Sequence, residues 1–94
     1  MIEWKDTSNF RQDDKDRVPN EFTLWAGSFR IVVHRHIHYP KDMWLASCYP
    51  YVFDQRELKS KDIKEAQCQA VSILEVILRD ALDALAEYRG NHER

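Results

Sequence analysis

Residues 22–39 read FTLWAGSFRIVVHRHIHY, and this stretch decides the fold. It is rich in β-branched and aromatic residues, and it is interrupted once, by the pair Gly27-Ser28, which favours a two-residue turn of type II′. Such a turn predicts a hairpin with three apolar pairs on one side: Phe22 with Val33, Leu24 with Ile31, and Ala26 with Phe29. Because this register and the hydrophobic pattern agree, we expect that side of the hairpin to face the core.

The opposite side of the predicted hairpin is mixed in character. Alternation places Trp25 and Arg30 on it, followed by the three histidines of the HRHIH motif, His34, His36 and His38. Since aromatic, cationic and polar side chains share this side, we expect it to face solvent or a partner.

A third strand is predicted after the hairpin. Residues 39–42, YPKD, favour a turn, and residues 43–49, MWLASCY, have strand character. Pro50 cannot donate a hydrogen bond to a neighbouring strand, so residues 51–54 are interpreted as an edge extension or a bulge. Residues 54–62, DQRELKSKD, are interpreted as a loop.

The last part of the chain predicts one long amphipathic helix. From Ile63 to about Tyr88, the apolar residues fall within one half of a helical wheel. Either Ser60 or Asp62 can cap its start, and a glutamate three residues after Asp62 has the capping-box spacing. Gly90 stands where a C-terminal stop is expected.

Together these elements predict an α+β fold, in which a three-stranded or alternatively four-stranded antiparallel sheet packs on one long C-terminal helix. The expected organisation is an N-terminal arm over residues 1–20, partly mobile, a single β-β-β-α domain over residues 21–90, and a frayed tail over residues 91–94.

Composition narrows the classes of function. With 94 residues, 44% of them hydrophobic, the chain can build one core without a metal. Its net charge of -2 is far from the basic excess of proteins that bind phosphate backbones. The sequence contains neither a transmembrane-length apolar stretch nor a secretory signal, so we expect a soluble, cytoplasmic protein. Cys48 and Cys68 lack metal-ligand spacing and are expected to be free thiols.

The HRHIH motif supports two hypotheses. Histidines at alternate strand positions can share a metal, as in some zinc enzymes, but such a site needs a third ligand, and only Glu21 could supply a nearby carboxylate. We therefore predict neither a metal nor a cofactor, and interpret this side of the hairpin as a partner-binding surface. The predicted surface consists of Trp25, Arg30, His34, His36 and His38, with Tyr49 or Tyr51 as further candidates.

The helix offers a second candidate surface. Its apolar arc covers about half the circumference, which is more than a three-stranded sheet is expected to bury. Val71, Leu78 and Leu82 form one edge of this arc, and Val76 lies apart from it among charged residues. We expect this helix flank to contact a partner or a second copy in a homodimer; the alternative is that the N-terminal arm completes the core.

Catalytic patterns are weak in this sequence. Ser47 and Cys48 adjoin His34 in the expected register, but no glycine-rich elbow accompanies them. Gly27 and Gly90 are the only glycines, which excludes a phosphate-cradling loop. We therefore predict no catalytic residue.

The order strand, strand, strand, long helix, with DMWLASC at residues 42–48 and IKEAQCQA at residues 63–70, resembles small phage and prophage proteins of β-β-β-α build. This resemblance covers residues 21–88 and extends to anti-CRISPR and other anti-defence proteins, while the helix start and the preceding strand are also similar to antitoxins of the HicB type. It implies a non-enzymatic protein in the host cytoplasm that inhibits a host protein complex, such as a CRISPR-Cas or other defence effector, by occupying its surface. The alternatives are a nucleic-acid-associated or antitoxin-like module and a metal-dependent enzyme that uses HRHIH.

Overall fold

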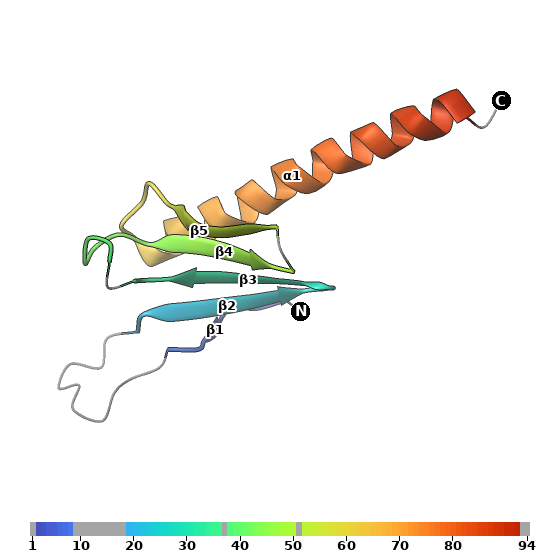
Figure 1. Cartoon of the computed structure of the whole chain (residues 1–94). Coiled ribbons are helices and arrows are strands. Elements are labelled where there is room, and N and C mark those ends of the chain that lie inside the picture. Colours follow the sequence, from blue (N-terminus) through green and yellow to red (C-terminus); the bar gives the residue numbers. More distant parts are fainter. Residues whose placement is uncertain (1, 9–18, 37, 51, 93–94) are drawn as a thin grey trace.

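The protein is an antiparallel sheet with one long helix lying across one of its faces (Figure 1). The computed structural model describes residues 2–8, 19–36, 38–50 and 52–92, and within these residues it contains five strands and one helix. In chain order the elements are β1 (Lys5–Asp6), β2 (Glu21–Ala26), β3 (Phe29–His34), β4 (Leu45–Tyr49), β5 (Phe53–Glu57) and α1 (Ile63–His92). The strands follow one another across the sheet in sequence order. The predicted α+β class is confirmed.

The central hairpin forms as predicted. Strands β2 and β3 pair in the expected register, Phe22 with Val33, Leu24 with Ile31, and Ala26 with Phe29. Gly27 has a φ of +58°, whereas Ser28 stays out of the positive-φ region. Positive φ at the first turn residue alone is what a type II′ turn requires and what distinguishes it from type I′.

Two strands lie mostly where the sequence predicted an arm and a loop. Strand β1 occupies part of the predicted N-terminal arm, and most of β5 falls within the predicted loop at residues 54–62. Both are edge strands whose side chains are almost all solvent-exposed, so neither needs the alternating apolar pattern by which an inner strand is recognised. The expectation of three or four strands is therefore corrected to five in the described part of the chain. Residues 9–18 of the predicted arm lie outside the described residues.

Strand β3 ends at His34, so the predicted strand through all three histidines is wrong. Beyond this point, the His38 amide donates to Nδ1 of His36 at 3.1 Å, and the Tyr39 amide donates to the His36 carbonyl, also at 3.1 Å. These local hydrogen bonds take the place of ladder bonds and turn the chain. His36 and His38 therefore do not share a strand face with His34.

Helix α1 covers the apolar side of the hairpin, as expected from the sequence. Ala66 and Ala70 have no exposed surface, and their short side chains allow α1 to approach β3 and β4 closely. Trp4 packs, partly buried, against the same cluster, so the N-terminal segment contributes to the core. The buried cluster consists of Leu24, Ile31, Val33, Trp44, Ala46, Cys48, Leu58, Ala66, Ala70 and Leu74.

Asp62 caps the start of α1. Its Oδ2 accepts a hydrogen bond from the Glu65 amide at 3.1 Å, and its carbonyl accepts the Ala66 amide at 2.9 Å. In a capping box the glutamate would bond back to the Asp62 amide. Here the Ser60 hydroxyl takes that place: it accepts the Asp62 amide at 3.2 Å and donates to the Glu65 carboxylate at 2.8 Å.

The far end of α1 extends beyond the sheet. Gly90 does not adopt the positive φ of a glycine cap, and the helix runs past this predicted stop to His92. Its 30 residues measure about 45 Å, whereas a strand of six residues measures about 20 Å. The molecule is accordingly 64 Å long but only 26 by 20 Å across, and the overhang is visible in Figure 1.

Two isoleucines test the assignment of the core. Ile31 is 1% exposed and Ile2 is 63% exposed. We expect Ile31→Ala to lower the free energy of unfolding by about 2–5 kcal/mol, because it removes buried methylene groups and leaves a cavity. The matched change Ile2→Ala should alter it by less than about 0.5 kcal/mol. Urea unfolding followed by circular dichroism measures both, and equal losses would contradict this packing.

Candidate functional site

The face of the sheet turned away from α1, called the open face below, carries a row of three large side chains. Trp25 on β2 pairs with Arg30 on β3, and Arg30 pairs with Tyr49 on β4. Trp25 is 49% exposed and Tyr49 is 38% exposed. The guanidinium carbon of Arg30 lies 4.7 Å from the centroid of the Tyr49 ring, a cation–π contact. We call these residues the Trp25–Arg30–Tyr49 row.

A shallow pocket of about 330 Å³ lies beside this row. Thr23 and Val32, which pair across β2 and β3, are buried open-face residues that contribute to its lining. The Thr7 and Thr23 hydroxyls are 2.8 Å apart and hydrogen-bonded, which ties the segment after β1 to this lining. Its remaining lining residues are Glu21, Trp25, Arg30, His34 and Tyr49. The pocket therefore combines aromatic walls with charges of both signs.

A polar network lies next to the pocket. The hydroxyl of Ser47, a residue only 1% exposed, is 3.0 Å from Nε2 of His34 and 3.0 Å from Oδ1 of Asp54. The same hydroxyl accepts the Gln55 amide at 2.9 Å. Ser47 thus joins β3, β4 and β5 on the open face.

A bulge in β5 brings two of these partners to Ser47. Pairing between β4 and β5 shifts register between Ala46 and Cys48, and Gln55 adopts a φ of +47°. This left-handed conformation is unfavourable for a residue with a side chain and persists only where surrounding contacts fix it. The hydrogen bond from the Gln55 amide to Ser47 is such a contact.

The hydrogen-bond partners of Ser47 determine where its proton lies. A serine hydroxyl has one proton to donate, the Gln55 amide can only donate, and an ionised Asp54 can only accept. The Ser47 proton therefore points to Asp54, and Nε2 of His34 donates to Ser47. In a catalytic triad the serine instead donates to the histidine. The arrangement is that of a structural network and does not activate Ser47 as a nucleophile.

Burial lowers the pKa of His34 below its ordinary value, because the charged imidazole loses solvation. The Arg35 backbone and the carboxylates of Glu21 and Asp54 oppose this effect, and His36 reinforces it. The net result favours neutral His34 at pH 7. Burial likewise raises the pKa of the Cys48 thiol, so Cys48 behaves as a core residue rather than a nucleophile.

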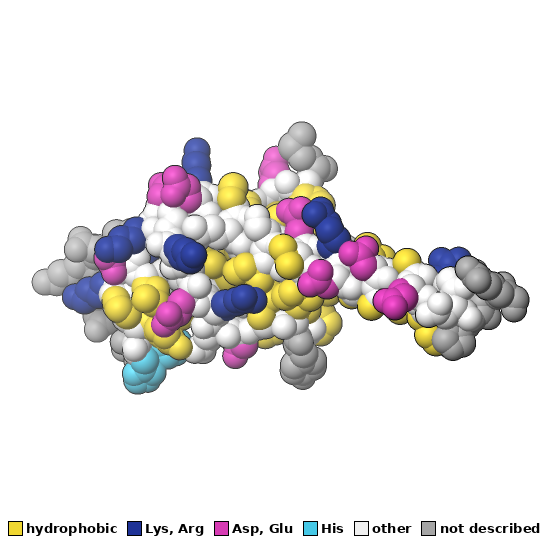
Figure 2. Space-filling model, turned by 90° about the horizontal axis from the view of Figure 1, so that it is seen from above, with side chains coloured by type: hydrophobic (Ala, Val, Ile, Leu, Met, Phe, Trp, Pro, Cys, Tyr) yellow, Lys and Arg dark blue, Asp and Glu magenta, His cyan; other side chains and the backbone are white. Residues whose placement is uncertain are grey.

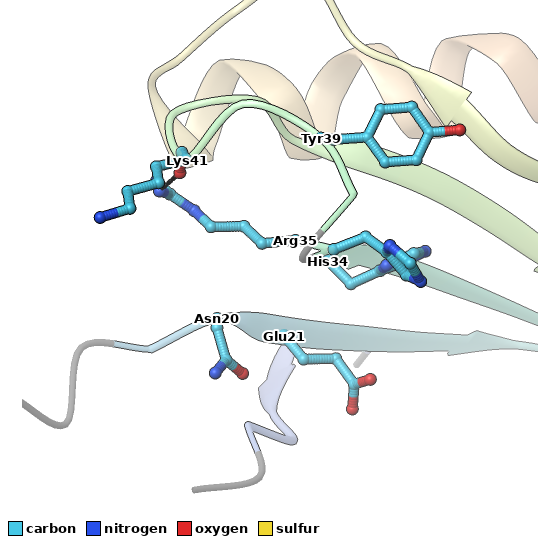
Figure 3. Close-up of a pocket in the computed structure, with 7 residues that line it drawn as sticks. Asn20, Glu21, His34, Arg35, Tyr39 and Lys41 are labelled. Carbon is cyan, nitrogen blue, oxygen red and sulfur yellow. Dashed lines mark hydrogen bonds between the residues drawn. The ribbon is translucent and has the colours of Figure 1, made fainter. Parts of the chain in front are cut away.

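A larger open cleft of about 690 Å³ adjoins the pocket and shares Glu21 and His34 with it. Within it, the Arg35 guanidinium stacks 4.3 Å from the centroid of the Trp44 ring and donates to the Lys41 carbonyl. Figure 3 shows Arg35 extending toward Lys41 while the Glu21 carboxylate points away from it. The complete lining is Asn20, Glu21, His34, Arg35, His36, Tyr39 and Lys41.

His36 and His38 lie beyond the end of β3 and contact each other. Their ring centroids are 5.1 Å apart, and the Tyr39 ring meets His36 edge-on at 5.8 Å. Nδ1 of His36 already accepts the His38 amide and is not available to a metal in this arrangement. Among the described residues, no three or more His, Cys, Asp or Glu side chains are grouped so that they could hold a metal ion.

The predicted contact residues lie in three separate parts of the structure. Trp25, Arg30 and His34 lie together on the open face. His36 and His38 lie at its edge, and Val76 is 58% exposed on α1.

Sequence reasoning missed two contributors to this face, Asp54 and Thr7. Alternation along β4 places Tyr49, one of the two tyrosines considered as further contact residues, on the same side as Ser47. Tyr51, the other one, lies outside the described residues. Asp54 and Thr7 depend on a bulge and on an edge strand, for which the sequence carries no clear signal.

The chain finds no match among protein-family models, and none among curated proteins or solved structures. The helix of the described region does not combine the length and the apolar character that crossing a bilayer requires.

Replacing Ser47 tests the polar network. We expect Ser47→Ala to lower the free energy of unfolding by about 1–3 kcal/mol, because the Gln55 amide and His34 lose their acceptor. Ser72→Ala, at an exposed position of α1, should change it by less than about 0.5 kcal/mol. Chemical denaturation of both variants measures the difference. A Ser47→Ala protein as stable as wild type would show that the network contributes nothing.

The depressed pKa of His34 predicts a pH dependence of stability. Between its ordinary pKa of about 6.5 and its lower folded value, the unfolded chain binds a proton that the folded chain does not. Stability present above pH of about 6.5 is therefore lost as the pH falls through the folded pKa. Unfolding measured at pH 7 and pH 5 should show a smaller loss for His34→Gln than for wild type, and an unchanged loss for the exposed, non-titrating control Ser72→Ala. A loss in His34→Gln equal to that of wild type would count against this assignment.

Proposed function

We propose that this protein acts by binding, and that it occupies the surface of a protein partner through the Trp25–Arg30–Tyr49 row and the adjoining pocket. The observation that carries the proposal is the exposure of two aromatic side chains on either side of an arginine. Tryptophan, tyrosine and arginine are the residues most enriched among those that dominate the energy of protein interfaces.

The way the row is held supports this role. Arg30 pairs with residues on both neighbouring strands, and its stacking on Tyr49 restricts the guanidinium before any partner arrives. A restricted side chain loses less conformational entropy on binding than a free one. Beside the row, on the same face, Thr23, Val32 and Ser47 are buried and pair across the three central strands. The row therefore presents a prepared contact surface.

The charges of the site indicate the chemistry of the partner. Arg30 keeps donors that match a carboxylate, and Trp25 and Tyr49 offer apolar area beside it. Glu21 lines the same pocket, which disfavours a continuous phosphate backbone, and the net charge of the chain is -2. An acidic side chain flanked by apolar groups on a folded protein fits this combination.

The resemblance of residues 21–88 to small phage anti-defence proteins supports a more specific form of the proposal. In that form the partner is a host protein complex, such as a CRISPR-Cas or other defence effector. Occupying a working surface of the complex would inhibit it without any catalytic step.

Charge reversal at the row tests the proposal. Immobilised full-length protein captures partners from a bacterial lysate, and the affinity for the purified partner is then measured for each variant. We expect Arg30→Glu and Trp25→Ala each to weaken binding at least tenfold, a loss of about 1.4 kcal/mol or more. Val76→Glu, a change at a position of α1 that is 58% exposed, should bind as wild type.

Retained affinity in both row variants would show that this face is not the contact. A salt titration tests the alternative that the partner is a nucleic acid. If the protein captures nucleic acid with an affinity that falls steeply as salt rises, the partner is a phosphate backbone and not a protein.

A further inference from the structure

The overhanging part of α1 exposes a large apolar surface. From Arg79 to Asn91 every side chain is exposed, including Leu82 at 66%, Leu85 at 60% and Tyr88 at 59%. Figure 2, a view from above, shows hydrophobic side chains between acidic and basic ones along this projecting part. Large apolar side chains that continue along one helix face are typical of a helix that packs against another element.

The spacing of these side chains matches a helix–helix seam. Leu78, Ala81, Leu85 and Tyr88 follow one another at intervals of three, four and three residues, the spacing of the two apolar positions of a heptad. Leu82 flanks this seam on the same side. Val76 lies nine residues from Leu85, and at 100° per residue that places it on the opposite side of the helix.

We propose that a second copy of this chain covers the seam, and that the two α1 helices cross antiparallel near Leu82. This inference is independent of the open face, because the seam lies on the helix and, after Leu78, which packs partly buried against the core, consists of exposed residues.

The shape of the protein favours the antiparallel orientation. A parallel partner helix would run the full length of α1, including the first turns, where the sheet and Trp4 already occupy the apolar side. An antiparallel partner centred on Leu82 overlaps only the part of α1 that is clear of most of the sheet. The two sheets then lie at opposite ends of the helix pair.

The antiparallel register also places complementary groups level with each other. Glu75 and Arg89 each lie seven residues from Leu82, so Glu75 of one copy is level with Arg89 of the other, twice across the two-fold axis. Leu78 and Leu85 lie four and three residues from Leu82 and meet near the crossing. A heptad seam is complementary to a second copy of itself. An unrelated partner would need the same spacing of apolar residues to fit it.

The length of the contact sets the expected affinity. From Glu75 to Arg89 the helix measures about 21 Å, shorter than the three to four heptads of a stable coiled coil. Interfaces below about 1,200 Å² occur in reversible complexes. The dimer should therefore dissociate on dilution.

Sedimentation equilibrium of the full chain over a range of concentrations tests the dimer. We expect wild type to change from monomer to dimer as concentration rises, and Leu82→Glu and Leu85→Glu to raise the dissociation constant at least tenfold. Val76→Glu, 58% exposed on the opposite side, should dimerise as wild type. Circular dichroism confirms that each variant is folded. A wild type that stays monomeric at several hundred micromolar would overturn the proposal, as would dimerisation unaffected by both leucine variants.

Disulfide trapping tests the orientation. In a Cys68→Ser background, which removes the exposed native thiol, Glu75→Cys chains are mixed with Arg89→Cys chains under mild oxidation. We expect the mixed disulfide to form in preference to either homodisulfide. If Glu75→Cys chains join to one another instead, the helices pair in parallel and the antiparallel arrangement is wrong.

Discussion

The contact of α1 with one face of the sheet is the constraint on which the other features depend. The helix approaches strands β3 and β4 closely because the side chains of Ala66 and Ala70, which face them, are small. Once α1 has taken the Leu24, Ile31 and Val33 side, pleating directs the alternate residues of the same strands away from it. The open face is thus a direct consequence of helix packing, and it carries polar and charged residues beside the buried Val32 and Leu45.

Because α1 packs on the other face, polar groups and large aromatic side chains can meet on the open face. Ser47 is buried on the open face and needs hydrogen-bond partners, which His34, Asp54 and the Gln55 amide supply. Gln55 adopts an unfavourable backbone conformation in this arrangement, and the resulting hydrogen bonds connect β3, β4 and β5.

Strong periodicity made the hairpin, the third strand and the helix predictable. Side chains of these elements point in turn to the core and to solvent, so apolar and polar residues recur in the sequence at regular intervals. The edge strands left no such record, since β1 and β5 have solvent on most sides. For the same reason Asp54, placed by a bulge, could not be assigned to the site. The three histidines were misjudged for a different reason: alternation suggested one strand, whereas a local hydrogen bond between His36 and His38 turns the chain.

The difference in length between α1 and the sheet gives the apolar side of the helix two environments. Along the first turns this side is buried by β3 and β4, and Leu74 is only 5% exposed. Leu78 still packs partly buried against the core, and beyond it the same side stays apolar through Leu85 although its side chains are exposed. A helix that only had to pack on this sheet could become polar after Leu78. The persistence of the pattern, set against Val76 on the opposite side, supports the proposal that a second copy covers the overhang.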